Sequence, residues 1–394
     1  MQLRYPDYYP KFQCTASACQ DNCCIGWEID IDAESCARYR RQPGDFGERL
    51  RKSISGGAEP HFLLRKERCP FLNEKNLCDI TLTLGEGALC EICTQHPRFH
   101  EWFGGVKESG IGLCCEAAAR LILQSPQPAA FVSAEIDEEP VPDFEEEGLF
   151  AVMVPAREHL FALLQDRAHS VGERLGAALV FACALQECLD GENPAEAVAE
   201  LNRFCRAERV FFFQKAEGYA PQRKQGEERA LWAEMLSFLL TLEPIDADWP
   251  KRLRGISEEL GDILKAQPGF FGEYAPRLYA YEHLAVYFVY RYLLKAVYDG
   301  DVLSKVKLMA VSVLCISLLD TACWREKHRF LPKDRVRIAV GYSKEIEYCQ
   351  ENLTSFSEAS WQNPCFSAEN LLALLGRMSA LEQGADAQRR PEKG

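Results

Sequence analysis

The sequence lacks the motifs that are typical of the common nucleotide-binding and hydrolytic enzymes. It contains no G-x-G-x-x-G, no Walker A, no G-x-S-x-G and no H-E-x-x-H pattern. Gly110-Ile111-Gly112 is a weak G-x-G match without the third glycine that a dinucleotide loop needs. The motifs therefore give no support to a Rossmann dinucleotide site, a P-loop NTPase, an α/β-hydrolase or a zincin.

Positive charge and long apolar runs are also scarce. The chain has 45 Lys and Arg against 59 Asp and Glu, a net charge of −14, which argues against nucleic acid or an anionic membrane surface as partner. The best membrane candidate, Leu308–Leu319, is 12 residues long and too short to span a bilayer. The first residues, MQLRYPDYYPKFQC, lack the apolar core of a secretory signal. We expect a cytosolic protein.

Cysteine, by contrast, is abundant and grouped. Eleven of the 18 cysteines lie between Cys14 and Cys115, in the clusters CTASACQDNCC, CPFLNEKNLC, CEIC and CC. In a reducing compartment such groups favour metal ligands over structural disulfides. Four thiolates suffice for one zinc ion or one [4Fe–4S] cluster, so the grouped cysteines indicate two sites, or one site with bystanders. The spacing C-x4-C-x3-C-C does not distinguish a zinc site from an iron–sulfur cluster.

Local patterns place these cysteines on short elements. Asp30 or Asp32 is expected to cap a short helix that carries Cys36. Cys90 and Cys93 are three residues apart, so a helix puts both on one face. NEKN is turn chemistry, which lets Cys69 and Cys78 face each other across a hairpin-like loop. Residues 103–112 are interpreted as a Gly-rich loop. Cys114 and Cys115 are expected in the first turn of the helix EAAARLIL. His96 and His100 follow Cys93, and packing at a helix end is preferred to a ligand role.

The remainder predicts a mainly α fold: a small irregular Cys-rich metal-binding module followed by an α-helical domain. Residues 135–147 carry eight acids and no Lys or Arg, as is typical of an exposed linker or flap. Apolar residues recur at helical spacing from about residue 155. Asn193-Pro194 is a helix start. The predicted boundaries are 1–123 for the module, 124–154 for the linker, 155–382 for the helical domain and 383–394 for a disordered tail.

Four segments carry a family resemblance. CTASACQDNCCIGWEI, RCPFLNEKNLCDI, LCEICTQHPRF and GLCCEAAARLIL resemble the flagellin lysine-N-methylase family and the wider group of cysteine-cluster proteins related to it. YEHLAVYFVYRYL, in the helical half, resembles the methylases less specifically. The resemblance implies methyl transfer from S-adenosylmethionine to lysine ε-amines of flagellin, and a [4Fe–4S] cluster held by N-terminal cysteines. The matching positions are Cys14, Cys19, Cys23, Cys24, Cys69, Cys78, Cys90, Cys93, Cys114 and Cys115.

Alternatives from other classes remain open beside this reading. One is a zinc-stabilised binding module without catalysis, and another is a redox or metal-handling cluster protein with a helical docking domain. A methylase must bind lysine as the free amine, because the ordinary lysine pKa is about 10.4. An aromatic pocket with a Glu, Asp or Tyr would serve. The sequence singles out no catalytic residue and no S-adenosylmethionine pocket.

Overall fold

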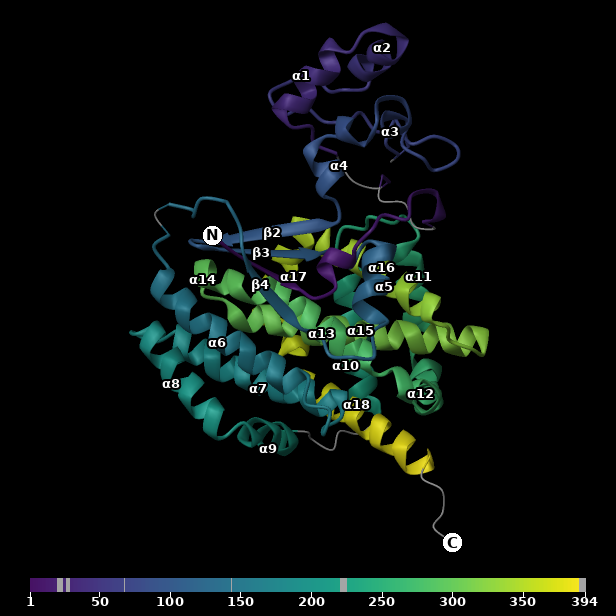
Figure 1. The fold of residues 1–394 in the computed structure, drawn as a ribbon. Coiled ribbons are helices and arrows are strands. Elements are labelled where there is room, and N and C mark those ends of the chain that lie inside the picture. The colour runs from purple at the N-terminus through teal and green to yellow at the C-terminus, as the bar shows by residue number, and fades with distance from the viewer. Residues whose placement is uncertain (20–23, 26–28, 67, 143, 220–224, 390–394) are drawn as a thin grey trace.

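The computed structural model describes residues 1–19, 24–25, 29–66, 68–142, 144–219 and 225–389. Most of these residues are helical, as the sequence predicts, and a small sheet joins them (Figure 1). The first part holds β1 (Gln2–Pro6), α1 (Ala33–Arg41), α2 (Gly44–Lys52), α3 (Asp79–Leu84), α4 (Glu91–Gln95), β2 (Arg98–Phe103), β3 (Val106–Ile111), α5 (Glu116–Leu123) and β4 (Phe131–Glu135).

In the described residues that follow β4, the regular elements of the larger body are helices. They are α6 (Glu147–Leu164), α7 (Val171–Leu189), α8 (Pro194–Ala207), α9 (Val210–Tyr219), α10 (Gln225–Leu239), α11 (Trp249–Glu258), α12 (Leu260–Tyr274), α13 (Tyr279–Tyr292), α14 (Ala296–Asp299), α15 (Val302–Lys327), α16 (Pro332–Glu347), α17 (Gln350–Gln362) and α18 (Ala368–Arg389). Short 3-10 turns punctuate the chain at η1 (Tyr9–Lys11), η2 (Ala16–Ala18), η3 (Glu86–Ala88), η4 (Ala275–Arg277), η5 (Leu293–Lys295) and η6 (Pro364–Phe366).

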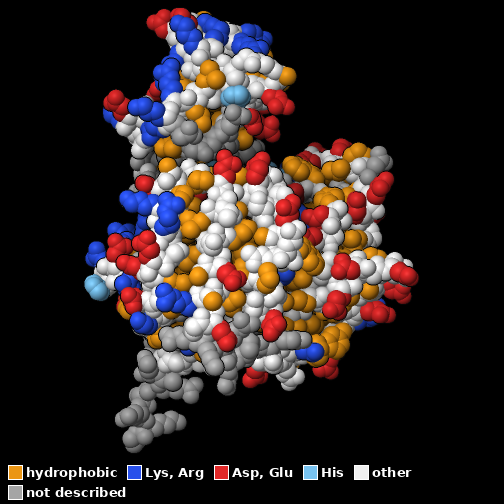
Figure 2. Space-filling view, turned by 180° about the vertical axis from the view of Figure 1, so that it is seen from behind, with side chains coloured by type: hydrophobic (Ala, Val, Ile, Leu, Met, Phe, Trp, Pro, Cys, Tyr) orange, Lys and Arg blue, Asp and Glu red, His pale blue; other side chains and the backbone are white. Residues whose placement is uncertain are grey.

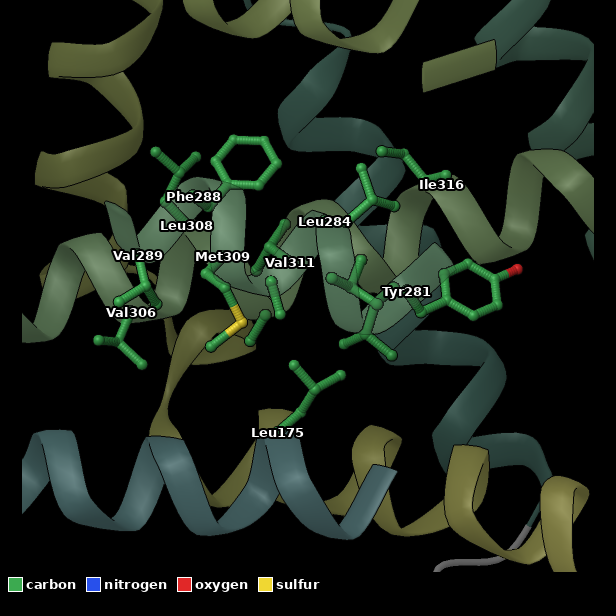
Figure 3. Packing of buried hydrophobic residues seen from close by; sticks show 14 of the residues in the cluster. Leu175, Tyr281, Leu284, Phe288, Val289, Val306, Leu308, Met309, Val311 and Ile316 are labelled. Carbon is green, nitrogen blue, oxygen red and sulfur yellow. The ribbon is translucent and has the colours of Figure 1, made fainter. Parts of the chain in front are cut away.

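Helices α13 and α15 form the centre of the body. Nearly every residue of both is buried, and α7, α12 and α18 pack around them. Figure 3 shows Leu284 and Phe288 of α13 beside Met309 and Val311 of α15, with Leu175 of α7 facing them. α15 is long and apolar enough to cross a membrane, but 94% of its most apolar stretch is buried inside the protein. Core packing therefore accounts for its apolar sequence.

The sheet has the strand order β2-β3-β1-β4, and the sequence reading did not foresee it. β2 and β3 form an antiparallel hairpin in which Phe103 pairs with Val106, so Gly104 and Gly105 make a two-residue turn. Gly104 has φ +55°, a conformation that glycine adopts without strain. β3 then pairs in parallel with β1. The predicted Gly-rich loop at 103–112 is thus wrong, because these residues end β2 and form β3.

The predicted boundaries differ from the observed elements in three places. The expected linker at 124–154 contains β4, which pairs with β1, and its last residues begin α6 at Glu147. Part of the expected module packs on the body, since Phe103, Ile111 and Leu113 belong to the large apolar core. The expected disordered tail from 383 begins as helix, because α18 continues to Arg389.

A second, smaller apolar core lies in residues 29–93. Ile29, Tyr39, Leu50, Phe62 and Phe71 are at its centre, each at most 1% exposed. Asp32 caps α1, as predicted, by accepting from Ser35 N at 2.8 Å. These residues form a lobe that is joined to the body through α4 and β2 (Figure 1). The lobe projects from the body in the space-filling view as well (Figure 2). We call this lobe, residues 29–95 with Cys24, the cysteine lobe.

Candidate functional site

The structure divides the predicted cysteines into two groups. Cys24, Cys69, Cys78, Cys90 and Cys93 lie in or against the small core of the cysteine lobe. Cys19, Cys114 and Cys115 lie around the start of α5, where Cys115 is the N-cap residue and Cys19 donates to Glu116 at 3.7 Å. Cys14 is exposed. Cys23 lies outside the described residues.

The lobe group brings together thiols from four chain segments. Cys69 N donates to Cys24 O at 2.9 Å, and Cys78 pairs with Leu72 across the turn that follows Cys69. Cys90 and Cys93 share a side-chain hydrogen bond, as the predicted helical spacing requires. That bond lowers the pKa of Cys90 and raises the pKa of Cys93, which burial and the neighbouring thiolates of Cys24 and Cys69 raise further. Burial raises the pKa of Cys69 to about 11.

This thiol group matches a soft metal in donor chemistry. Five sulfur donors lie in or against the small core, and sulfur is the ligand type that zinc and iron–sulfur clusters take. In the described part of the chain, no three His, Cys, Asp or Glu side chains stand in the arrangement of a metal site. The residues thus fit a soft metal by donor type alone, and the metal remains a prediction.

The α5 group belongs to a polar junction between the lobe and the body. Cys114 Sγ donates to Tyr348 Oη at 2.7 Å, and Tyr348 Oη lies 3.2 Å from Nδ1 of His96. His96 is the C-cap residue of α4, and Tyr348 is the C-cap residue of α16. Burial raises the pKa of Cys114 to about 12 and that of Tyr348 well above its ordinary value. Both groups are therefore neutral at physiological pH, and we call this chain the Cys114–Tyr348–His96 relay.

A buried glutamate anchors the body side of the same junction. Glu347 Oε2 accepts from the phenols of Tyr287 and Tyr292, each at 2.8 Å, and lies 3.4 Å from Arg291 Nε. Arg291 Nη1 donates to Tyr287 Oη at 2.8 Å. Burial alone would lower the pKa of Arg291, but the two phenols and Glu347 raise it well above its ordinary value. Arg291 therefore stays charged beside Cys114.

Glycine at position 112 lets the two sides of the junction approach. A Cβ there would lie 3.1 Å from Cys114 Sγ, 3.2 Å from Arg291 Nη1 and 3.3 Å from Pro97 O. Leu113 N donates to Tyr287 Oη at 3.1 Å and adds a second link to the body. The sequence reading found His96 and Cys114 but missed Arg291, Glu347 and Tyr348. The sequence carries no local signal for Glu347 and Tyr348, which are common residue types at the end of α16.

Other polar candidates from the sequence have structural partners. His100 contacts Ser109 Oγ at 2.7 Å, and Arg98 lies 5.0 Å from the centre of the Phe12 ring. Glu282 binds Arg167 and Arg174, and His283 contacts Ser125 O at 2.9 Å. Packing at a helix end holds for His96 as well, but with the relay contact added.

Comparison with known proteins now identifies the body. Residues 157–374 match the family described as FliB lysine N-methylase C-terminal domain, which is more than half of the chain. The chain belongs to the FliB lysine N-methylase family. The match contains the body side of the junction, with Arg291, Glu347 and Tyr348, whereas His96 and Cys114 lie N-terminal to it.

Curated relatives of the FliB family come from Salmonella. Proteins named lysine-N-methylase from Salmonella typhimurium (strain LT2) and Salmonella choleraesuis (strain SC-B67) are 31% identical to the chain over 133 residues, which is 32% of this chain and 33% of each relative. A flagellar biosynthetic protein FliU from Salmonella muenchen has the same identity over the same length, which is 79% of that protein. The aligned part thus spans about a third of the curated methylases. No solved structure shows a significant match.

Proposed function

We propose that this protein transfers methyl groups from S-adenosylmethionine to lysine ε-amines of flagellin in the cytosol. The observation that carries the proposal is the family match over residues 157–374. The names of the Salmonella relatives add lysine N-methylation and flagellar biosynthesis as the setting. Methyl transfer requires the free amine, since a protonated lysine has no lone pair to attack the methyl group.

The Cys114–Tyr348–His96 relay is our candidate for handling that proton. Imidazole is the side chain whose protonation changes near neutral pH, and the relay fixes one of its nitrogens by a hydrogen bond. The neutral phenol of Tyr348 can donate to His96 while it accepts from Cys114. The positive charge of Arg291 next to Cys114 favours a side chain with a lone pair or a negative charge beside Cys114. A lysine ammonium that contacts Cys114 would give its proton to Cys114 as Cys114 passes its own to Tyr348 and Tyr348 passes its own to His96 Nδ1. His96 would become the imidazolium, and the lysine would be left as the free amine.

A second part of the proposal concerns the metal. Cys24, Cys69, Cys90 and Cys93 are the residues that would hold a [4Fe–4S] cluster, with Cys78 as a fifth thiol beside them. When bound, such a cluster would cross-link chain segments around a core too small to be stable by burial alone. Zinc would take the same thiolates and give the same cross-links. The proton transfer from lysine proposed above uses only side chains of the protein and no metal.

The metal is tested by anaerobic purification with iron, sulfide and zinc analysis. We expect about four irons and four sulfides per chain. The double substitution C90S/C93S should remove them, and C14S, at an exposed cysteine outside the lobe group, should retain them. Stoichiometric zinc without iron would replace the cluster by a structural zinc site. Retention of full iron in C90S/C93S would contradict the ligand assignment.

The activity is tested with the metal-loaded chain, S-adenosylmethionine and purified flagellin. We expect mass shifts on lysine-bearing flagellin peptides that depend on the methyl donor. Y348F and H96N should lower kcat and change its pH profile, whereas a purely structural role would lower the amount of folded protein and leave the profile of the remainder unchanged. Absence of any donor-dependent shift with the metal-loaded protein would refute the proposed reaction and favour a non-catalytic binding protein.

A further inference from the structure

A small aromatic pocket opens on the helical body, away from the polar junction. It lies where the end of α12, the turn η4 and the C-terminal part of α15 meet, and its volume is about 220 Å³. In Figure 1, α12 lies low in the body and the cysteine lobe lies at the top. The lining residues are Phe270, Glu273, Tyr274, Pro276, Arg277, Trp324 and Phe330.

Four aromatic rings make the walls. Phe270 stacks on Tyr274 with ring centres 5.3 Å apart, and Phe330 presents its edge at 5.3 Å from each. These three are at most 5% exposed. Trp324 is half-buried and stands 6.3 Å from Phe270, so it forms the outer wall. The rings thus enclose a space with aromatic surfaces on several sides.

The position of Trp324 is fixed from two directions. A Cβ on Gly269 would lie 2.7 Å from the indole ring, so only glycine allows this close approach. Glu273 Oε2 accepts the indole N–H at 2.8 Å. Glu273 is exposed, and its carboxylate therefore stands at the mouth of the pocket next to the Trp324 ring. An aromatic wall and a carboxylate are held together as one unit.

The charges around the pocket leave room for a cation. Arg335, on the inner side, lies 4.9 Å from the Tyr274 ring centre and 5.6 Å from that of Phe330. Its charge is compensated by Asp320 at 2.5 Å. Arg277, at the rim, is exposed, and Glu273, at the mouth, carries the opposite charge. The same rings already hold one buried cation, which shows that their faces attract positive charge.

The volume of the pocket and its few hydrogen-bond acceptors limit which ligands it can bind. Pockets for whole drug-sized molecules measure about 300–1,000 Å³, so 220 Å³ fits a side chain or head group. An unmethylated ammonium has three N–H donors, and burying them without acceptors is costly. The pocket offers one carboxylate, which already accepts from Trp324. N-methyl groups remove those donors and keep the charge, which suits aromatic walls.

The geometry points to a receptor for a methylated lysine side chain on a protein. This inference rests on the proposed function, because it assigns to the pocket the product that the reaction would generate. Binding of a modified lysine by the pocket would hold a flagellin chain that has already been methylated while the junction acts on another lysine. The pocket would then favour repeated methylation of the same chain.

The test is calorimetric titration of the full chain, without methyl donor, with a short peptide carrying Nε-trimethyl-lysine and with its unmodified twin. We expect the trimethylated peptide to bind about tenfold more tightly. W324L and E273Q should abolish that preference. W361L is the matched control, since Trp361 on α17 is 51% exposed and does not line the pocket.

Equal affinity for the two peptides, or a preference that W324L leaves unchanged, would overturn the inference. Displacement of the trimethylated peptide by S-adenosylmethionine, but not by S-adenosylhomocysteine, which lacks the sulfonium charge, would assign the pocket to the sulfonium donor and would likewise overturn the inference. The binding test needs no turnover, because the peptide arrives methylated. A chain that binds the peptide but transfers no methyl groups would refute the proposed reaction alone.

Discussion

The buried ion pair between Glu108 and Arg157 offers the sharpest test of how the sheet is held on the body. Arg157 of α6 binds both carboxylate oxygens of Glu108 on β3, with Nη1 to Oε2 at 2.6 Å. The side chains are 0% and 4% exposed. Arg157 also stacks over Tyr290 of α13, 5.1 Å from the ring centre. Burial lowers the pKa of Arg157, but Glu108 more than offsets this and raises it.

Removing one partner should therefore leave the other charge buried without a counter-charge. We expect E108L or R157M alone to lower the free energy of unfolding by about 3–5 kcal/mol. The double variant E108L/R157M should recover most of that loss, because replacing both charges by apolar groups of similar volume is often neutral. The coupling energy between the two sites should then be several kcal/mol.

Urea unfolding followed by far-ultraviolet circular dichroism measures these free energies. The ion pair of the preceding β3 residue, Lys107 with Glu138 at 2.7 Å, serves as control, because Glu138 is 45% exposed. Its removal by E138Q should leave stability nearly unchanged. The reasoning would be refuted by a single variant at Glu108 or Arg157 that unfolds like the wild type, or by a double variant that loses the sum of both.

Three further outcomes follow from close contacts and buried carboxylates. G172A should cost about 1–3 kcal/mol in urea unfolding, because its Cβ would lie 2.3 Å from Leu375 O of α18, whereas G255A, with open space around it, should stabilise by about 0.4–1 kcal/mol. Burial raises the pKa of Glu382 to about 7, so its ionised form destabilises the fold. The free energy of unfolding should therefore fall as pH rises from about 4.5 to 7, and E382Q should remove this pH dependence in unfolding measured across pH. D32A should cost about 1–2 kcal/mol and speed amide exchange in α1 and α4, because Asp32 accepts from Ser35 N and Glu91 N.

Local signals in the sequence were sufficient for most helices. The cap at Asp32 and the start at Pro194 depend on residues within one turn, and both lie where the pattern predicts. The apolar stretch around Leu308 became the core helix α15 for the same reason. Helix formation is governed by neighbours three and four residues away, so a single sequence contains the information.

The sheet needed information that local patterns do not contain. Leu3 of β1 pairs with Lys107 of β3, more than 100 residues further along the chain. Gly110 weakens the strand signal of β3, yet the glycine is required, since a Cβ there would lie 2.3 Å from the ring of Phe99 on β2. A residue that argues for a loop in the sequence is thus a condition for the strand pairing.

The candidate site was predicted on the lobe side and missed on the body side. Cysteine is rare enough that a cluster of cysteines is informative by itself. The clusters therefore indicated Cys90, Cys93 and Cys114 as candidate site residues. Tyr348 and Glu347 belong to common residue types at the end of an ordinary helix. The fold places Tyr348 beside residues 234 and 252 positions earlier in the sequence, and Glu347 beside tyrosines 60 and 55 positions earlier. A single sequence does not encode such a meeting in any local pattern.

The short helix α4 joins the two parts of the site. Cys93, in the lobe thiol group, is the middle residue of this five-residue helix, and His96, in the relay, is its C-cap residue three positions later. A helix this short is held by its surroundings and not by its own hydrogen bonds. Whatever binds the lobe thiols therefore also sets the position of His96 against Tyr348. If the lobe binds the proposed metal, its loss would shift His96 through this one turn, so such a metal would affect the proposed methyl transfer without taking part in the chemical step.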